Sequence, residues 1–435
     1  MDFIYVMLIT TTFFIFLCVV FKSAGINFVG RKSHPLTLFV VMQFCILSLP
    51  GVILISFLGF ESKRYAGIDE TIKSSVGYWY VYSLFVYFFI LFLLLKSFRC
   101  VWYDKFVAEK IDNKCNDDLF NIVLFMALIL FVLKIVFSKP APLWYLMLGD
   151  AHTAYAVRVD MQLNHEKYYI PYISKFISQY LVYQFYFCLY YFVFAVKKNK
   201  RMFLGVMLSF VIAAIECLYD TQKAPFIFML VGALFIFYLK KQSFLKVTLP
   251  VLMIFFVLIV MQSVVSDSDL LVGVNHAVDR FILGQNQGFY HIINSINPDP
   301  KYWFNGFYFI KQLGVEVSRA DVDVLPYTIY KDSEIVNVNS YYLGEAWSMF
   351  GVLGLILSPF IVAIMTFVYV KVIDLLIGNE ALMTIPFMVY FIPTINVQQS
   401  FNYFLYSKSF CLSLLLFLMT IVIIKSIFFA IARSK

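Results

Sequence analysis

Long apolar runs recur along this chain, and they restrict its fold more than any other feature. A hydrocarbon layer about 30 Å thick is crossed by a helix of roughly 20 apolar residues. Hydrophobic residues make up 62% of the chain and charged residues 14%, whereas soluble proteins have about 45–50% and about 25%. We therefore expect an all-α integral membrane protein with about eleven transmembrane helices (10–12), forming a single membrane domain over residues 1–435. The runs lie near residues 3–21, 35–59, 77–95, 119–137, 177–196, 202–219, 224–239, 247–264, 350–373, 381–397 and 409–430.

The basic residues predict how these helices are oriented. Alternate loops carry an excess of lysine and arginine, and the loops between them are slightly acidic. Because loops rich in lysine and arginine stay in the cytoplasm, the N-terminus is expected outside and the C-terminus inside. The net charge of +8 is explained by this topology signal and predicts no nucleic-acid partner. The basic loops contain Lys22, Arg31 and Lys32; Lys96, Arg99, Lys105, Lys110 and Lys114; Lys197, Lys198, Lys200 and Arg201; Lys240, Lys241 and Lys246.

Two of the outer loops are too long to be simple connections. One spans about residues 138–176, and a larger one spans about 265–349. Both are amphipathic and rich in aromatic residues, so amphipathic helices that fold back onto the outer membrane face are expected there. Most of the histidines lie in these loops. A functional site at the outer leaflet is the interpretation that follows.

The segment 269–297 carries the first candidate residues. At helical spacing, Arg280, Gly284, Gln287 and His291 lie on one face, and the opposite side is apolar. A guanidinium, an amide and an imidazole suit a diphosphate and sugar hydroxyls. The alternative is the solvated face of an interfacial helix.

A second group of charges ends an apolar helix at 212–225. Glu216, Asp220 and Lys223 follow one another at i, i+4 and i+7. Ionisable groups at membrane depth are costly and usually have a function, so a cation with neighbouring carboxylates could face an anionic lipid head group. The alternative is interfacial snorkelling with an ion pair at the helix end.

Two further candidates lie elsewhere in the outer loops. Arg158, in 150–164, either points into an outer cavity or faces water. Glu345, in 338–354, lies at the outer end of a helix. The alternative to a functional role is an acid that the helix dipole favours near the N-terminus.

The sequence contains no pattern typical of a metal or nucleotide site. There is no HExxH motif and no phosphate-binding glycine loop with Walker residues. The pairs Asp267/Asp269 and Asp321/Asp323 are better explained as caps or turns in loops. A mechanism without metal or cofactor is therefore expected.

Taken in order, four of these places resemble the bacterial O-antigen polymerase family, which polymerises oligosaccharide repeat units. The places are Arg158 in the first long outer loop, TQKAP around Lys223, RFILGQNQGFY from Arg280, and YLGEAWSMFGVLG around Glu345. The topology, with many helices and one large late outer loop, is similar over the whole chain.

The resemblance implies a GT-C-like membrane glycosyltransferase fold with a lipid-facing cavity. It implies that a growing glycan passes from undecaprenyl diphosphate to the terminal sugar of an incoming undecaprenyl-diphosphate-linked repeat unit. This is a step of O-antigen or surface polysaccharide biosynthesis at the periplasmic face of the bacterial inner membrane. Displacement of a diphosphate from an anomeric carbon needs cations for the leaving group and an acceptor for the hydroxyl proton.

The same resemblance also implies which partners and which residues take part in this reaction. The implied partners are the lipid-linked substrates, membrane lipid and a chain-length regulator protein, with no cofactor. The expected diphosphate- and substrate-binding residues are Arg158, Lys223, Arg280 and Gln287. The candidates for the proton acceptor are Glu345, Glu216, Asp220 and His291.

Other functions are compatible with the same pattern. An O-antigen ligase would pass the glycan to lipid A core. A lipid-linked oligosaccharide flippase or other transporter usually shows internal repeats and charges near the bilayer midplane, whereas here the charges gather at the outer rim. A non-catalytic scaffold of an envelope assembly is a third class.

The orientation can be tested by single-cysteine labelling on a background in which all seven cysteines are replaced. Cysteines at Lys200 and Lys241 are expected to face the cytoplasm, and a cysteine at Asn305 is expected to face outward, because basic loops are retained inside. The readout is labelling of intact spheroplasts by an impermeant reagent. Labelling of position 241 from outside would contradict the topology.

Overall fold

The computed structural model describes residues 3–28, 33–98, 117–137, 141–163, 173–196, 200–241, 274–275, 279–307, 310, 312–331, 337–398 and 401–434. The predicted helix near 247–264 and the first residues of the large loop, 265–273, lie outside the described residues.

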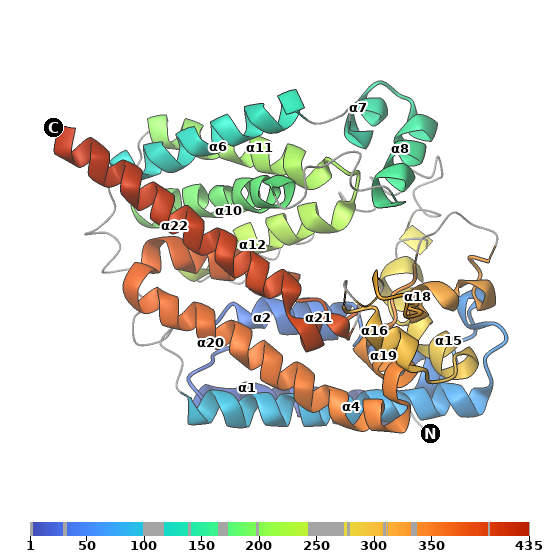
Figure 1. Ribbon diagram of the computed structural model, residues 1–435. Helices are drawn as coiled ribbons and strands as arrows, with labels where there is room; N and C mark the ends of the chain where they lie inside the picture. The colour runs from blue at the N-terminus through green and yellow to red at the C-terminus, as the bar shows by residue number, and fades with distance from the viewer. Residues whose placement is uncertain are drawn as a thin grey trace.

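The described chain is helical and contains no β-strand, only an isolated bridge between Asn27 and Ser33. The long elements run roughly side by side as a bundle (Figure 1). They are α1 (Phe3–Ser23), the run of α2 (Leu36–Phe39), η1 (Val40–Ile46), α3 (Leu49–Val52) and η2 (Ile53–Phe57), then α4 (Glu70–Ser97), α6 (Asp117–Phe137), α10 (Ile173–Phe194), α11 (Lys200–Leu218), α12 (Lys223–Lys241), α20 (Val352–Phe391) and α22 (Lys408–Ser434).

Seven described helices are long and apolar enough to cross a membrane. Two shorter apolar helical stretches, Thr10–Ser23 and Glu380–Thr394, accompany them. The all-α class is confirmed, and the helices indicate a multi-pass membrane protein. The count of about eleven stays a prediction. The seven spans are Leu36–Phe57, Glu70–Ser97, Asp117–Phe137, Lys200–Leu218, Lys223–Lys240, Val352–Ile377 and Lys408–Ile431.

The 40 residues of α20 contain the two helices that the sequence predicts near 350–373 and 381–397. Glu380 has φ −139° and ψ 60°, which is not helical, so the chain reverses there. The carboxylate of Glu380 forms an ion pair with Lys425 of α22. The turn is thereby tied to the last helix.

The helix α10 lies in the middle of the bundle and packs against α6, α11, α12, α20 and α22. Its side chains are buried almost without interruption from Tyr180 to Tyr191. Because protein rather than lipid surrounds it, α10 tolerates polar groups. Gln184 accepts a hydrogen bond from Ser209 of α11 at 2.7 Å.

Large apolar side chains remain exposed on the outer helices, as expected for surfaces that face lipid. Examples are Phe16 on α1, Phe89 on α4, Phe125 on α6, Leu204 on α11 and Val422 on α22. In a soluble protein, apolar surface this extensive would cause aggregation. The exposed belt therefore supports the membrane assignment independently of hydropathy.

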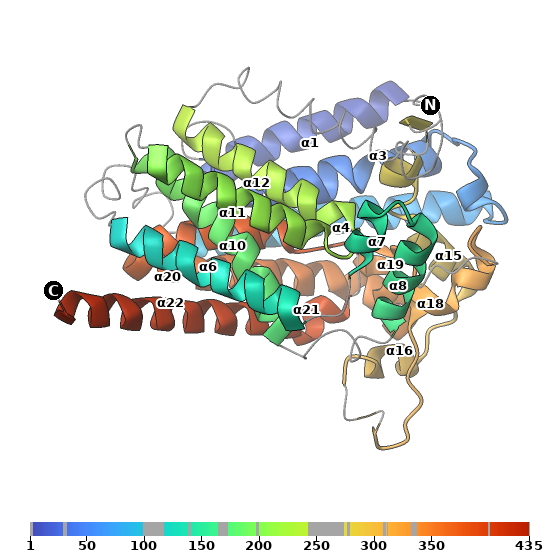
Figure 2. The same cartoon turned by 90° about the horizontal axis from the view of Figure 1, so that it is seen from above.

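Both long loops lie at one end of the bundle, which we call the loop end. The two loops contain several short helices. Figures 1 and 2 show these helices together at the loop end, near the start of α1, whereas α22 ends at the opposite end of the bundle. The shared end agrees with the alternation of basic and acidic loops. The short helices are α7 (Pro142–Met147), α8 (Ala151–Leu163), α15 (Gln287–Ser295), α16 (Pro300–Phe304), α18 (Ala320–Asp323) and α19 (Tyr341–Phe350).

The polar segment from Asp279 to Ser295 is not the continuous helix that its spacing predicts. A π-helical turn, η4 (Asp279–Leu283), is followed by a turn at 284–286, and only then does α15 begin. The expectation that Arg280, Gln287 and His291 share one helix face is therefore wrong. Asn286 is fully buried and donates through Nδ2 to the carbonyl of Ser48 at 2.7 Å, which fixes the break.

Gly51 allows this segment to approach the transmembrane bundle. A Cβ atom at Gly51 would lie 2.2 Å from the carbonyl oxygen of Ile282 and 3.3 Å from the amide of Asn286. Backbone cannot move aside as a side chain can. Only glycine lets the 282–286 turn pack at this distance, although the sequence suggests Pro50-Gly51 merely as a kink.

The substitution Gly51→Ala is expected to destabilise the protein by about 1–3 kcal/mol, because it forces two backbones apart. The measurement is the thermal unfolding midpoint in detergent. Gly205→Ala is the matched control, since its Cβ meets only side-chain atoms of Phe120 and Leu124 at 3.0–3.2 Å. Equal midpoints for Gly51→Ala and the unmodified protein would show that the close contact is not maintained.

Candidate functional site at the loop end

Three cations predicted from separate parts of the sequence come together at the loop end. Arg158 belongs to α8, Lys223 begins α12 and Arg280 lies in η4. Their charges act on one another: Arg280 acts on Arg158, and both arginines act on Lys223. We call Arg158, Lys223 and Arg280 the cation cluster.

The positive charges of the cation cluster oppose one another. Burial lowers the pKa of the Arg158 guanidinium, and the positive charge of Arg280 lowers it further, against the opposing effects of Tyr155 and Asp220. Arginine nevertheless keeps its proton in proteins. Arg280 is exposed, and among the described residues its guanidinium has no hydrogen bond or ion pair. Cations that act on one another in this way favour an anionic ligand.

The turn between α11 and α12 brings Asp220 and Lys223 to this place. Asp220 lies near Arg158, whose positive charge it favours. Thr221 has φ +55°, in the left-handed region that a β-branched residue rarely adopts. Strain of this kind costs about 1–3 kcal/mol and persists where surrounding contacts hold it. The tight turn therefore places an acid and a cation within four residues.

Glu216 has a structural partner that the sequence pattern alone does not reveal. Its carboxylate forms an ion pair with Lys134 of α6, and both side chains are only 5% exposed. Lys134 also donates to Ser178 at 3.2 Å and lies 4.1 Å from the centre of the Tyr219 ring. Breaking such a buried pair leaves an uncompensated charge, so Glu216 first serves to fix the end of α11.

A second ion pair explains where Gln287 and His291 lie. Arg64, in the short helix η3 (Lys63–Tyr65), binds Asp279 through Nε at 2.7 Å and donates to Gln287 Oε1 at 3.2 Å. It also donates to the hydroxyl of Tyr330. Gln287 and His291 are buried in this network, away from the exposed Arg280.

The ion pair with Asp279 affects both the pKa of Arg64 and the placement of Arg280, which follows Asp279 in the chain. Burial lowers the pKa of Arg64, but its hydrogen bonds to Asp279 and Tyr330 outweigh that effect, so the pKa is raised overall. Asp279 is therefore paired with Arg64. The next residue, Arg280, is exposed to solvent.

The side chain of His291 is fixed by a hydrogen bond to a backbone carbonyl group. Its Nε2 donates to the carbonyl of Arg64 at 2.8 Å. Burial lowers the pKa of His291, and this hydrogen bond only partly opposes the shift, so the ring is neutral near pH 7. A neutral ring fixed in this way positions the 64–65 turn.

Glu345 is buried in α19 and lies near Arg319 rather than in the cation cluster. The pKa of Arg319 is raised first by its hydrogen bond with Asp321 and then by the charges of Asp321 and Glu345. The two hydrogen bonds between Arg319 and Asp321 measure 3.1 and 2.5 Å. Glu345 thus belongs to a separate ionic group on the loop side.

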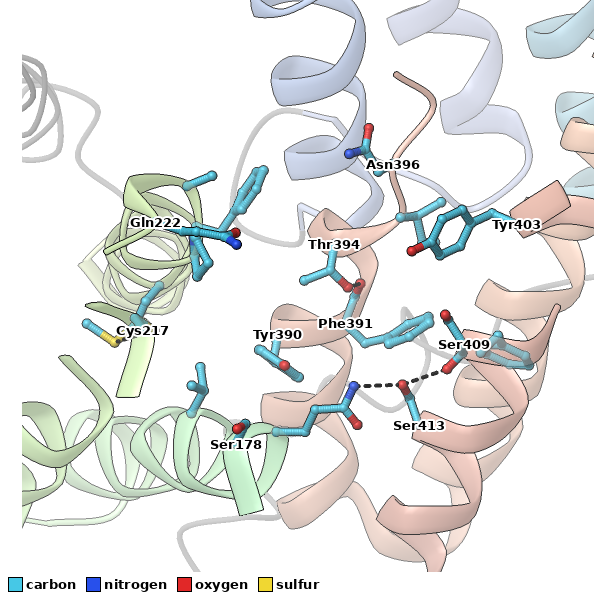
Figure 3. A pocket seen from close by; sticks show the side chains of 18 of the residues that line it. Ser178, Cys217, Gln222, Tyr390, Phe391, Thr394, Asn396, Tyr403, Ser409 and Ser413 are labelled. Atoms are coloured by element: carbon cyan, nitrogen blue, oxygen red, sulfur yellow. Dashed lines mark hydrogen bonds between the residues drawn. The ribbon is translucent and has the colours of Figure 1, made fainter. Parts of the chain in front are cut away.

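A cavity of about 480 Å³ opens beside the α11–α12 turn. Its walls come from α10, the α11–α12 turn, the end of α20 with η6 (Ile392–Thr394), and α21 (Asn402–Tyr406) with the start of α22. Figure 3 shows Gln222 pointing toward Thr394 across this space. Gln179 of α10 donates to Ser413 of α22 at 3.0 Å and closes one side.

The structure brings some of the predicted residues together and separates others. Arg158, Lys223, Asp220 and Arg280 converge, Glu216 and Asp220 line the cavity, and Gln287, His291 and Glu345 lie in other networks. Among the described residues no group of three or more histidine, cysteine, aspartate or glutamate side chains could hold a metal ion. A metal-free mechanism stays a prediction.

Two important residues escape the sequence reasoning. Lys134 is a charge at the end of an apolar run, which alone signals a buried partner. Arg64 lies in a short loop, and its partners are more than 200 residues away in sequence. No local pattern predicts such a pairing.

Comparison with known proteins adds no identification. No family model, curated protein or solved structure matches the chain.

Replacing Arg64 by methionine is expected to lower stability by about 1–3 kcal/mol, because Asp279, Gln287 and Tyr330 lose their partner. Thermal unfolding in detergent is the measurement. Lys301→Met is the control: its ammonium lies 3.8 Å from Glu316, which is 82% exposed, and such a surface pair contributes little. If both variants unfold at the same temperature, the Arg64 network does not hold the loop.

Proposed function

We propose that this chain is a membrane glycosyltransferase that polymerises lipid-linked oligosaccharide repeat units. It transfers the growing glycan from undecaprenyl diphosphate to the terminal sugar of an incoming undecaprenyl-diphosphate-linked repeat unit. The loop end faces the periplasm of a bacterium, and the bundle lies in the inner membrane. The resemblance of four sequence segments to O-antigen polymerases suggests this reaction.

The observation that carries the proposal is the convergence of Arg158, Lys223 and Arg280. These residues come from three segments that lie far apart in the sequence. A departing diphosphate carries the negative charge that such a cluster stabilises. Guanidinium groups bind phosphate oxygens through two parallel hydrogen bonds.

Asp220 is the proton acceptor that the geometry favours. It lies near Arg158 and also lines the cavity. His291 lies in the separate network of Arg64, and Glu345 lies near Arg319. In this proposal the acceptor hydroxyl gives its proton to Asp220 as its oxygen attacks the anomeric carbon and the diphosphate leaves.

Deleting the gene in its host distinguishes the function classes. Loss of a polymerase leaves surface glycolipid with a single repeat unit. Loss of a ligase leaves long polymer on undecaprenyl diphosphate, and loss of a transporter leaves repeat units in the cytoplasmic leaflet. Either of the last two results would contradict the proposal.

The sharpest variant is Arg280→Ala. Losing a charge-assisted contact to the departing diphosphate is expected to cost about 2–4 kcal/mol of transition-state stabilisation, or roughly 30- to 1000-fold in rate. Arg280→Lys is expected to recover only part, because lysine offers a point charge. The assay measures chain extension by purified protein with lipid-linked repeat units and excess EDTA.

Lys331→Ala is the matched control, since Lys331 is an exposed cation of the same loop. It is expected to retain full activity. Asp279 remains paired with Arg64 when Arg280 is replaced, so the variant is expected to accumulate normally. Long polymer made by well-accumulated Arg280→Ala protein would rule out Arg280 as a ligand of the diphosphate.

A further inference from the structure

The short helices α7 and α8 form a hairpin whose turn is apolar and exposed. Figures 1 and 2 show this hairpin at the loop end, past the ends of α6 and α11. Residues 142–149 include no charged side chain. Met147 and Leu148, which we call the hairpin tip, are 69% and 82% exposed, and Trp144 and Leu146 are exposed beside them. A contiguous apolar patch of this kind marks a contact with lipid or with another protein.

The side chains at the adjoining end of α6 show which medium surrounds it. In the last turn of α6 the charged residue, Lys134, is buried, whereas Val136 and Phe137 are 67% and 73% exposed. A helix end in water has the opposite arrangement, with its charges outside. The helix α6 is one of the seven membrane-spanning candidates, so the exposed side chains of its last turn face hydrocarbon. The lipid-facing surface therefore extends to Phe137, the last residue that the structure describes before the hairpin.

The helix α7 begins at nearly the same depth as the last turn of α6. The ammonium group of Lys134 lies 4.1 Å from the centre of the Tyr219 ring, and the backbone N–H of Leu143 donates to the Tyr219 carbonyl at 3.3 Å. One residue thus contacts both helices. The six residues of α7 rise only about 9 Å, so its exposed side chains lie near the same boundary of the hydrocarbon layer. Trp144 fits this place, because tryptophan concentrates at membrane interfaces.

The contacts between the hairpin and the bundle include one small apolar cluster. It consists of Ala141, Met161 and Tyr219, with Val157 packed against it. The helix α8 has 13 residues, and an isolated helix of this length is marginally stable in water. Arg158 directly follows Val157 in α8, so the place of this cation depends on how firmly the hairpin is held.

We propose that the hairpin tip inserts into the membrane leaflet at the loop end and thereby holds Arg158 in the cation cluster. The tip binds the acyl-chain region of the lipid, because its apolar surface continues that of α6. Asp150 follows the tip and accepts a hydrogen bond from the backbone N–H of Thr153 at 2.9 Å. The polar start of α8 is thereby kept at the head-group level. The inference goes beyond the proposed function, since it names no ligand of the cation cluster.

The first experiment measures the depth of the tip in the full chain, in nanodiscs of phosphatidylethanolamine and phosphatidylglycerol. A nitroxide is attached to a single cysteine, Leu148→Cys, on a background without the seven native cysteines. Its collisions with oxygen, which concentrates in hydrocarbon, are compared with its collisions with a water-soluble nickel chelate. Val136→Cys is the lipid reference and Lys331→Cys the aqueous reference, because both residues are exposed. We expect position 148 to favour oxygen, as position 136 does.

Two other results at position 148 would overturn the proposal. A preference for the nickel chelate, as at position 331, would place the tip in water. Protection from both reagents would show that protein covers the tip, either a second copy of this chain or another partner.

The second experiment measures whether the tip holds α8. In Met147→Ser/Leu148→Ser protein in the same nanodiscs, the backbone amides of α8 are expected to exchange hydrogen at least about tenfold faster, which corresponds to about 1.4 kcal/mol. Leu313→Ser/Val315→Ser is the matched control, because both residues are exposed apolar side chains of the large loop, and it is expected to leave exchange in α8 unchanged.

Both residues of the tip are exposed, so the double variant is expected to fold, and Leu148→Ser alone serves if it does not accumulate. Unchanged exchange in α8 would mean that the bundle alone holds Arg158. That result would overturn the proposal even with the tip in lipid. Neither experiment uses a ligand, so a failure of the proposed function leaves both results valid.

Discussion

A hydrocarbon layer offers no hydrogen-bond partners, and the arrangement of this molecule follows from that constraint. Charged groups inside the bundle must meet each other, as Lys134 and Glu216 do. The central helix α10 carries glutamine and tyrosine because protein surrounds it, whereas the outer helices present phenylalanine and leucine. Other charged groups lie toward the ends of the bundle, such as Arg64 with Asp279 at the loop end and Glu380 with Lys425 at the turn within α20.

At that end, one ion pair organises the large loop. Arg64 binds Asp279, Gln287 and Tyr330, and Gly51 lets the 282–286 turn lie directly on the bundle. Because Asp279 is engaged on one side, its neighbour Arg280 is exposed on the other. The Arg64–Asp279 pair thus positions Arg280 without touching its side chain. Residues of the same type, such as Arg64 and Arg280, therefore lie in different environments, one buried and one exposed.

The sequence predicts the membrane class and the apolar helices well, because hydropathy is a local property. It fails where a long-range contact overrides local spacing. The helical periodicity of 280–291 is interrupted since Asn286 bonds to Ser48, far away in the chain. Glu216 appears as a candidate acid, but its buried partner Lys134 lies in another helix. The cavity cannot be predicted at all, because five segments contribute its walls.

The turn between α11 and α12 has a geometric consequence. It is held at one side by the Glu216–Lys134 pair and strained at Thr221, and it contributes both to the cation cluster and to the cavity wall. The few residues of this turn therefore fix the distance between the cation cluster and the cavity wall. One inserted residue adds up to about 3.3–3.6 Å, more than a hydrogen bond tolerates. Natural variation in this turn should thus be confined to side chains, with its length held constant.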